Sequence, residues 1–394
     1  MKKLVYLISL GLVACGGGEP QSSSDLPRGV TDSSITIGSH TDLSGGLAIW
    51  GVPLTNGQRM RYGEANAAGG VHGREIRFVV EDSQYQMPIA VKATNKLLNV
   101  DEIFLMVGSM GTPMNIALMP KMFEANVPSL FPLTAAVQMH EPLHPMKFSY
   151  YVSYRDQIIG GMKYLVGKHA FRKVCGQFLA NDYGHENKVG FEAAVEQLGL
   201  EIMYVGNHKS TETDFVGTIT AIKNSGCEFL VLGPLVKDTI LIYSAARDAG
   251  WDAPVISNMV SYVPEVAAAA DGALEGLYAA ASFYVPDFEE ARANNTVVGE
   301  WAERYEDQFG EPPVPQSIIG YVTADLVVRA LQEAGPDLKL DAVLAALEGI
   351  DEYQDIFGGP SLSLSPTKHQ AANYLNMYQV NDGKWVVVEQ NISY

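Results

Sequence analysis

Two pairs of neighbouring side chains have the residue types that general acid–base chemistry uses. His40 and Asp42 stand in a polar, glycine-containing stretch at residues 39–46, and His185 is followed directly by Glu186. Neither pair is accompanied by a nucleophile in the G-x-S-x-G pattern of a strand-to-helix elbow. No G-x-G-x-x-G follows a predicted strand, and no G-x-x-x-x-G-K occurs. The sequence therefore favours a binding protein over an enzyme, and it predicts no cofactor.

The polar stretch at residues 39–46 lies between a predicted strand and a predicted helix. Residues 35–37 form a short alternating apolar run, which is typical of a buried strand, and small or apolar residues recur at helical spacing over residues 57–65. A loop in this position stands at the carboxyl end of a strand, where open α/β sheets bind their ligands. We interpret the loop, with Ser44 and the large aromatic Trp50, as one wall of a binding cleft.

The same alternation of strands and helices continues along the chain in two series. The first series has predicted strands at 77–82, 103–107 and 127–131. A short aromatic-rich run at 148–154 precedes the second, with strands at 173–180, 201–207, 227–233 and 254–257. Repeated units of this length indicate parallel sheets with helices on both faces. The sequence predicts an α/β fold of two Rossmann-like lobes, followed near its end by a hairpin that turns at Asp382 and Gly383.

Composition excludes several classes of protein. The 394-residue chain carries a net charge of −18 with only 27 Lys and Arg residues, and it shows no basic patch of the kind that nucleic-acid binding needs. After residue 14 no apolar run is long enough to cross a membrane. No Cys/His spacing typical of a metal site occurs. We therefore expect a globular body that binds neither nucleic acid nor metal.

The first residues have the pattern of a secretory signal. Lys2 and Lys3 precede an apolar run over residues 4–14, and residues 12–15 at its end are L-V-A-C. This ending resembles the lipobox of bacterial lipoproteins, in which Cys15 would receive the lipid, although an ordinary signal with a chance cysteine is the alternative. We expect residues 1–15 to be a lipoprotein signal peptide with its lipobox cysteine and residues 16–32 to be a flexible tether. The protein would then be periplasmic and lipid-anchored, with Gly16 compatible with the outer membrane.

Cys175 and Cys227 are the two cysteines left for the folded body. Both begin apolar runs, so they could lie at similar heights on neighbouring strands and form a disulfide in an oxidising compartment. Disulfide geometry is demanding, and two buried thiols that act as small hydrophobic side chains are the alternative. The sequence leaves both interpretations open.

Several short motifs, taken together and in order, resemble the type I periplasmic binding proteins of branched-chain amino acid ABC transporters, the Leu/Ile/Val-binding family. The matching pieces are L-S-G-G-L-A-I-W-G, N-A-A-G-G-V-H-G-R, E-D-S, N-D-Y-G, T-D-F, A-L-E-G and F-G-G-P-S-L-S-L-S-P. Each piece alone is weak, but together they cover nearly all of the chain after the tether.

The resemblance implies a fold and a function. It implies two lobes joined by three hinge crossings, which close over a ligand; the lobes would comprise residues 33–149 with 280–357, and 150–279 with 358–394. It also implies a substrate-binding protein that delivers a small solute to an ABC permease in the inner membrane. A sensor, or a carrier of lipids or other hydrophobic molecules on the same fold, is the alternative, because a fold does not fix a function.

The resemblance also assigns site residues. Trp50 matches the aromatic residue that packs on the ligand side chain, and Thr112 matches a hydroxyl residue that holds the ligand carboxylate. Thr134 and Ala136 match the second carboxylate-binding loop, and Tyr183 matches an aromatic residue of the opposite lobe. Amides at helix amino termini attract anions, so such a site needs no basic side chain.

Two positions depart from the family pattern. Leu235 stands where amino-acid binders place an aromatic residue, and Met259 stands where they place an acid that neutralises the ligand ammonium. A buried ammonium without a counter-charge is costly. The sequence therefore favours a carboxylated or largely apolar ligand. The chain's 14 methionines, Met110 among them, would suit an adaptable apolar pocket, although filling of the core explains them equally well.

Overall fold

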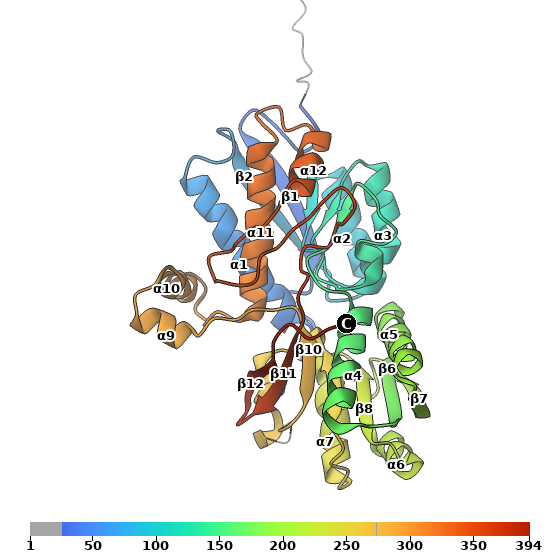
Figure 1. Cartoon of the computed structure of the whole chain (residues 1–394). Coiled ribbons are helices and arrows are strands. Elements are labelled where there is room, and N and C mark those ends of the chain that lie inside the picture. The colour runs from blue at the N-terminus through green and yellow to red at the C-terminus, as the bar shows by residue number, and fades with distance from the viewer. Residues whose placement is uncertain (1–25, 273) are drawn as a thin grey trace, which may run out of the picture.

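The computed structural model describes residues 26–272 and 274–394 and folds them into two α/β lobes, one above the other in Figure 1. Each lobe is built on one sheet with helices packed against it. The predicted fold class is confirmed. The predicted signal peptide, the predicted lipidation site at Cys15 and most of the predicted tether lie outside the described residues.

Lobe 1 is the upper lobe in Figure 1 and contains a five-stranded parallel sheet in the order β2-β1-β3-β4-β5. Its strands are β1 (Ser34–Thr41), β2 (Glu75–Asp82), β3 (Leu105–Val107), β4 (Ser129–Leu130) and β5 (Lys147–Phe148). Its first helices are α1 (Ala48–Ala67), α2 (Met87–Asn99), α3 (Thr112–Glu124) and the 3-10 turn η1 (Val137–Met139). The chain returns to this lobe with α9 (Phe288–Ala293), α10 (Val297–Phe309), α11 (Pro315–Glu333) and α12 (Leu340–Glu348).

Close packing of α1 against α11 joins the two parts of lobe 1. A Cβ atom at Gly57 of α1 would lie 2.0 Å from the carbonyl oxygen of Ser317, and one at Gly320 of α11 would lie 2.0 Å from that of Leu54. Only glycine allows the two backbones to approach so closely. The contact holds α1, which begins at the predicted binding loop, in a fixed position.

Lobe 2 contains a seven-stranded sheet in the order β12-β11-β10-β9-β8-β6-β7. Its strands are β6 (Lys173–Leu179), β7 (Glu201–His208), β8 (Phe229–Gly233), β9 (Val255–Asn258), β10 (Tyr278–Ala281), β11 (Asn376–Asn381) and β12 (Lys384–Glu389). Its helices are α4 (Tyr154–His169), α5 (Asp182–Leu198), α6 (Val216–Ser225), α7 (Val236–Asp248), α8 (Pro264–Ala267) and the 3-10 turns η2 (Met259–Ser261) and η3 (Ala269–Gly272). β11 and β12 are antiparallel and form the predicted hairpin, with positive φ at Asp382 and Gly383.

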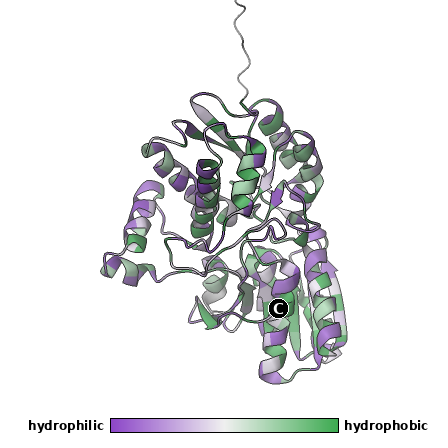
Figure 2. Cartoon of the chain, turned by 45° about the horizontal axis from the view of Figure 1, so that its top comes forward, coloured by the Kyte–Doolittle hydropathy of each residue, from purple (hydrophilic) through white to green (hydrophobic). Residues whose placement is uncertain are grey.

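Hydrophobic residues dominate the inner strands of the lower sheet, and many of the helices around them carry hydrophilic residues along part of their length (Figure 2). All five residues of β8 are buried. Burial on both faces is expected for the inner strands of a parallel sheet that helices cover. No helix among the described residues is long and apolar enough to cross a membrane.

Three segments connect the lobes. The first runs from β5 to α4, and its Val152 amide donates to the Ser282 hydroxyl of the second, 3.2 Å away. The third pairs with the first, because the Ser149 amide donates to the His369 carbonyl (2.7 Å) and the Ala371 amide to the Ser149 carbonyl (2.9 Å). These pairings place the second crossing just after β10.

The third crossing lies later in the chain than the sequence predicts. The predicted boundary after residue 357 would assign the next segment to lobe 2. In the structure Tyr353 and Leu362 form an antiparallel bridge, and the Leu364 amide donates to the Ile350 carbonyl of lobe 1 (2.8 Å). The chain therefore leaves lobe 1 near residue 370 and reaches lobe 2 at β11.

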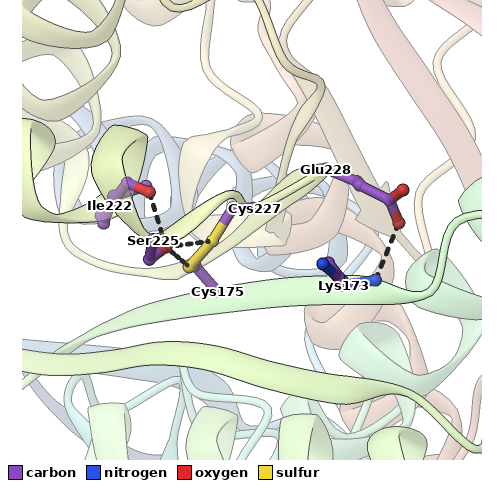
Figure 3. Close-up of a disulfide and its surroundings, with 6 residues drawn as sticks. All are labelled: Lys173, Cys175, Ile222, Ser225, Cys227 and Glu228. Carbon is purple, nitrogen blue, oxygen red and sulfur yellow. Dashed lines mark hydrogen bonds between the residues drawn. A yellow bond between two sulfur atoms is a disulfide. The ribbon is translucent and has the colours of Figure 1, made fainter.

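Cys175 and Cys227 form a disulfide in the structure (Figure 3). Cys175 lies in β6, and Cys227 lies just before β8, which is hydrogen-bonded to β6. Of the two alternatives that the sequence leaves open, the structure has the cross-link. It lies toward the amino ends of these strands, opposite the ends that face lobe 1.

Candidate ligand-binding site

A cavity lies between the two lobes. The volume that water molecules can reach inside it is about 40 Å³, and a hydrogen bond from Trp50 of lobe 1 to the Val260 carbonyl of lobe 2 crosses the cleft. The residues that line it are Leu47, Trp50, Tyr85, Met110, Gly111, Thr112, Leu133, Thr134, Tyr154, Tyr183, Leu235, Met259 and Val260.

The lining residues stand where strands end. In lobe 1 they follow the carboxyl ends of β1, β2, β3 and β4, and in lobe 2 those of β6, β8 and β9, while Tyr154 begins α4 beside the first crossing. Parallel strands direct these ends toward one edge of each sheet, and the two edges face each other. The cavity thus lies where open α/β sheets bind ligands.

Hydroxyl groups gather on the lobe 1 side of the cavity. The Oγ1 atoms of Thr112 and Thr134 are hydrogen-bonded at 2.7 Å, and the Ala136 amide donates to Thr134 at 3.3 Å. Burial raises the pKa of Tyr154 to about 12, although hydrogen bonds with the Ala135 backbone and Thr134 act in the opposite direction. These groups therefore stay protonated and neutral at physiological pH.

The start of α3 adds backbone donors to this side. Thr112 is the first residue of the helix, so its amide has no partner within the helix. Gly111 precedes it with φ of 100°, a conformation that favours glycine, at the end of the short loop between β3 and the helix. Hydroxyls and a helix amino terminus together make a neutral site that favours an acceptor or an anion.

The other walls are apolar. Trp50 is 4% exposed, and its Nε1–H donates across the cleft to the Val260 carbonyl, 3.3 Å away. Leu235 and Met259 face it from lobe 2. The Trp50 ring also stands 6.1 Å from that of Phe283 in the second crossing. An apolar group would therefore be held between the first loop of lobe 1 and the strand ends of lobe 2.

Tyr183 presents its ring to the cavity, while its hydroxyl is used elsewhere. The hydroxyl donates to the Pro234 carbonyl (3.0 Å) and accepts from the Asn258 side chain (2.9 Å). Burial raises the pKa of Tyr183 well above its usual value. Its ring meets that of Tyr154 edge to face at 4.9 Å. Tyr183 thus contributes an apolar surface to the site.

None of the described residues that line the cavity has a charged side chain. The buried acids behind it are engaged with protein groups. Asp238 lies 3.3 Å from His208, and Glu186 accepts from the Val137 amide at 3.0 Å. Asp42 accepts from the Leu47 amide at 2.8 Å. Burial raises the pKa of Glu186, which further disfavours a free negative charge at that position.

Comparison with known proteins identifies the family to which this two-lobed chain belongs. The sequence profile of a family described as periplasmic binding protein matches residues 34–384. The chain belongs to the periplasmic binding protein family. Members of this family bind solutes outside the cytoplasm, and the predicted resemblance is confirmed.

Individual relatives are distant. An amino acid binding protein of Pseudomonas aeruginosa is 25% identical over 244 residues, which cover 61% of this chain and 64% of that protein. A Leu/Ile/Val-binding protein homolog 2 of Brucella abortus is 25% identical over 346 residues, which cover 85% of this chain and 90% of that protein. The structure of a fatty acid ABC transporter substrate-binding protein from Thermomonospora curvata has a TM-score of 0.82 at 24% identity, covering 94% of this chain and 95% of that one.

Most of the predicted site residues of this periplasmic binding protein lie together in the cavity. They are Trp50, Met110, Thr112, Thr134, Tyr183, Leu235 and Met259. Two do not line it. Ser44 is exposed and donates to Asp82 (2.6 Å), because the Asp42 carboxylate binds the amides of residues 44, 45 and 47 and turns the loop outward. Ala136 is buried behind Thr134.

Six lining residues were not predicted: Leu47, Tyr85, Gly111, Leu133, Tyr154 and Val260. Tyr85 follows the E-D-S motif after β2 and reaches the cavity because it adopts a positive φ of 50°, which no sequence pattern indicates for a tyrosine. The position of Tyr154, in contrast, could have been predicted from the sequence. Ser153 and Asp156 have the spacing of a helix cap, and the Ser153 hydroxyl accepts from the Asp156 amide (3.1 Å), which fixes Tyr154 at the start of α4.

Proposed function

We propose that this protein is the substrate-binding component of an ABC-type importer, which closes over a small solute and delivers it to an inner-membrane permease. The observation that carries the proposal is the cavity at the facing strand ends of two lobes that three crossings connect. Hinge closure traps a ligand when the closed state makes contacts with it that the open state lacks. Membership of a family of solute-binding proteins supports binding and delivery rather than catalysis.

The expected solute is small and either amino-acid-like, carboxylated or apolar. Its polar end would lie at Thr112 and Thr134, and its apolar part would lie against Trp50, Leu235 and Met259. Relatives are named for amino acids, and one structural neighbour is named for a fatty acid. These names support a ligand with a carboxyl group and a hydrocarbon part.

The site of action would be the periplasm, with the protein held to a membrane by lipid on Cys15. Gly16 is compatible with the outer membrane. The first described residues lie at the end of lobe 1 that faces away from lobe 2 (Figure 1). An anchor there would leave both lobes and the cleft free to open and close.

Thr112→Val is expected to weaken ligand binding about 10- to 100-fold, since a hydrogen bond to a charged group contributes roughly 1.5–3 kcal/mol. Valine keeps the shape of this buried side chain and replaces its hydroxyl, which is also bonded to Thr134, with a methyl group. The ligand is first identified by mass spectrometry of protein purified under native conditions, and its affinity is then measured by calorimetry.

Ser44→Ala is the matched control for Thr112→Val, because it removes an exposed hydroxyl of a binding loop that does not line the cavity. Its affinity should equal that of the wild type. Equal affinities of Thr112→Val and wild type would contradict the assigned site. Uptake of the identified ligand by cells that lack the protein tests the importer function, and turnover of the ligand by the purified protein would count against it.

A further inference from the structure

The backbone carbonyl groups around the cavity already accept hydrogen bonds from the protein, whereas hydroxyl groups and a helix amino terminus can donate to a ligand. The carbonyl oxygens of Gly111 and Leu133 accept from the amides of Asn115 (3.0 Å) and Gly111 (3.3 Å). On the opposite side, the Leu235 carbonyl accepts from the Thr239 amide and hydroxyl, both at 2.9 Å. The lobe 1 hydroxyls remain protonated and can donate. The balance favours a ligand group that accepts hydrogen bonds.

The remaining polar groups of the lobe 2 wall are also engaged. The Met259 carbonyl accepts from the Tyr262 amide (3.0 Å), and the Val260 carbonyl accepts from Trp50. The Asn258 side chain, at the end of β9, accepts from the Val260 amide (2.8 Å) and donates to Tyr183. An ammonium group placed here would find no carboxylate among the described lining residues, and the oxygens on this wall each already accept a hydrogen bond.

The two buried carboxylates of lobe 2 behind the cavity, Glu186 and Asp238, do not supply a counter-charge to it, because Glu186 accepts from the Val137 amide and Asp238 pairs with His208. Asp238 is 2% exposed, faces His208 and does not line the cavity. His208 is held in turn by the Gln177 side chain, 3.2 Å from its Nδ1. Asp238 is thus part of a buried pair behind the wall. Charged groups removed from water require such partners, so an ammonium in the cavity would remain uncompensated.

We propose that the ligand is a small monocarboxylic acid without an α-ammonium group. Its carboxylate binds the Thr112 and Thr134 hydroxyls and the first amide of α3, and its hydrocarbon part lies against Trp50, Leu235 and Met259. Met259 determines this specificity, because a neutral thioether occupies the wall where a counter-charge would be needed. The inference rests on the proposed binding function and adds the charge of the ligand to it.

A matched pair of ligands tests the proposal directly. L-leucine and 4-methylpentanoate share one carbon skeleton and differ only in the ammonium group, and L-phenylalanine and 3-phenylpropanoate form a second pair. Calorimetry on the ligand-free full chain should show the acid of at least one pair binding 100-fold or more tightly than its amino acid. Amino acids that bind as well as their matched acids would overturn the proposal and leave the importer function standing.

Two further ligand measurements separate the remaining explanations. The amide 4-methylpentanamide should bind at least 10-fold more weakly than 4-methylpentanoate, and equal binding would overturn the carboxylate site.

Mass spectrometry of ligand retained through native purification gives a readout that does not depend on the choice of probe. A retained ammonium compound overturns the proposal, whereas a retained acid supports it. If no retained compound and no member of a wider solute panel binds, the proposed function itself fails.

Met259→Glu tests the specificity residue, with Met259→Gln as a neutral control of similar size. The glutamate variant should bind 4-methylpentanoate at least 10-fold more weakly than the wild type and should gain affinity for leucine. The glutamine variant should not gain affinity for leucine. An unchanged ratio of the two affinities in a folded Met259→Glu variant would overturn the role of Met259, and the wild-type ligand pairs decide the ligand class if that variant does not fold.

Discussion

Asp325→Ala is expected to lower the free energy of unfolding by about 3–5 kcal/mol, the cost of removing one partner from a buried ion pair. Asp325 is 8% exposed and lies in α11. Its carboxylate accepts from Arg61 Nε of α1 (2.6 Å), from Arg329 Nε (2.7 Å) and from the Tyr353 hydroxyl (2.8 Å). Alanine would leave the mostly buried Arg61 guanidinium and the Tyr353 hydroxyl without this acceptor.

Urea denaturation of the full chain measures this loss, and Arg329→Ala is the matched control. The Arg329 side chain is 57% exposed, so its ion pair with the same carboxylate should contribute about 1 kcal/mol or less. A large loss in Asp325→Ala beside a small loss in Arg329→Ala is the expected pattern. A loss below about 1 kcal/mol in Asp325→Ala would mean that the network does not hold α1 and α11 together.

The contribution of Asp325 should depend on pH in a defined direction. Burial opposes its ionisation, but hydrogen bonds from Arg329 and Arg61 outweigh burial and lower its pKa below the usual 3.8. A carboxylate whose pKa is lower in the folded state stabilises the protein above the pKa of the unfolded state, and this stability is lost as pH falls through the folded-state value. The stability difference between wild type and Asp325→Asn should therefore be constant near neutral pH and shrink below about pH 4. A difference that grows on acidification would contradict the assignment.

The sequence could predict the fold because each lobe is built from repeated local units. β8 is a short apolar run and β1 opens with an alternating one, and each is followed by a helix, whose apolar residues recur with a different period. Site residues in the first turn of a helix that follows a strand and a short loop, such as Trp50 and Thr112, could be predicted for the same reason. The end of each strand determines how far along the sheet these residues lie, and the parallel arrangement places them all at the same edge of the sheet.

The features that the sequence did not predict correctly depend on tertiary contacts, which leave no periodic pattern in the sequence. Ser44 points outward because of the hydrogen bonds that Asp42 accepts within the loop, and Tyr85 enters the cavity through a positive φ. The third crossing was placed too early because residues 353–369 are held to lobe 1 by isolated bridges and single hydrogen bonds rather than by a regular strand. Such long-range pairings are decided by tertiary structure, so they set limits on what a single sequence predicts.

Removing the disulfide with Cys175→Ala and Cys227→Ala together is expected to lower the free energy of unfolding by about 2–4 kcal/mol. The cross-link spans a sequence separation of 52 residues, and closing a loop of this length in the unfolded chain accounts for about 4 kcal/mol in the chain-entropy description. The loop contains α5, β7 and α6, so the bond joins the start of β8 to its neighbour β6 and closes the segment that carries the edge strand β7. Thermal and urea unfolding measure the loss.

The same measurements under reducing conditions separate the cross-link from simple packing. Cys175 is fully buried, so alanine also removes contacts of its sulfur atom. Dithiothreitol should lower the unfolding temperature of the wild type and leave that of the double variant unchanged. If the wild-type thiols are shown to be free and the unfolding temperature is still unchanged, the disulfide does not stabilise the protein. Because the disulfide and the lobe 2 cavity residues lie at opposite ends of the strands, ligand affinity should be the same with and without it. Reduction would then weaken the lobe without altering the site that it carries, which distinguishes a structural disulfide from a redox switch of binding.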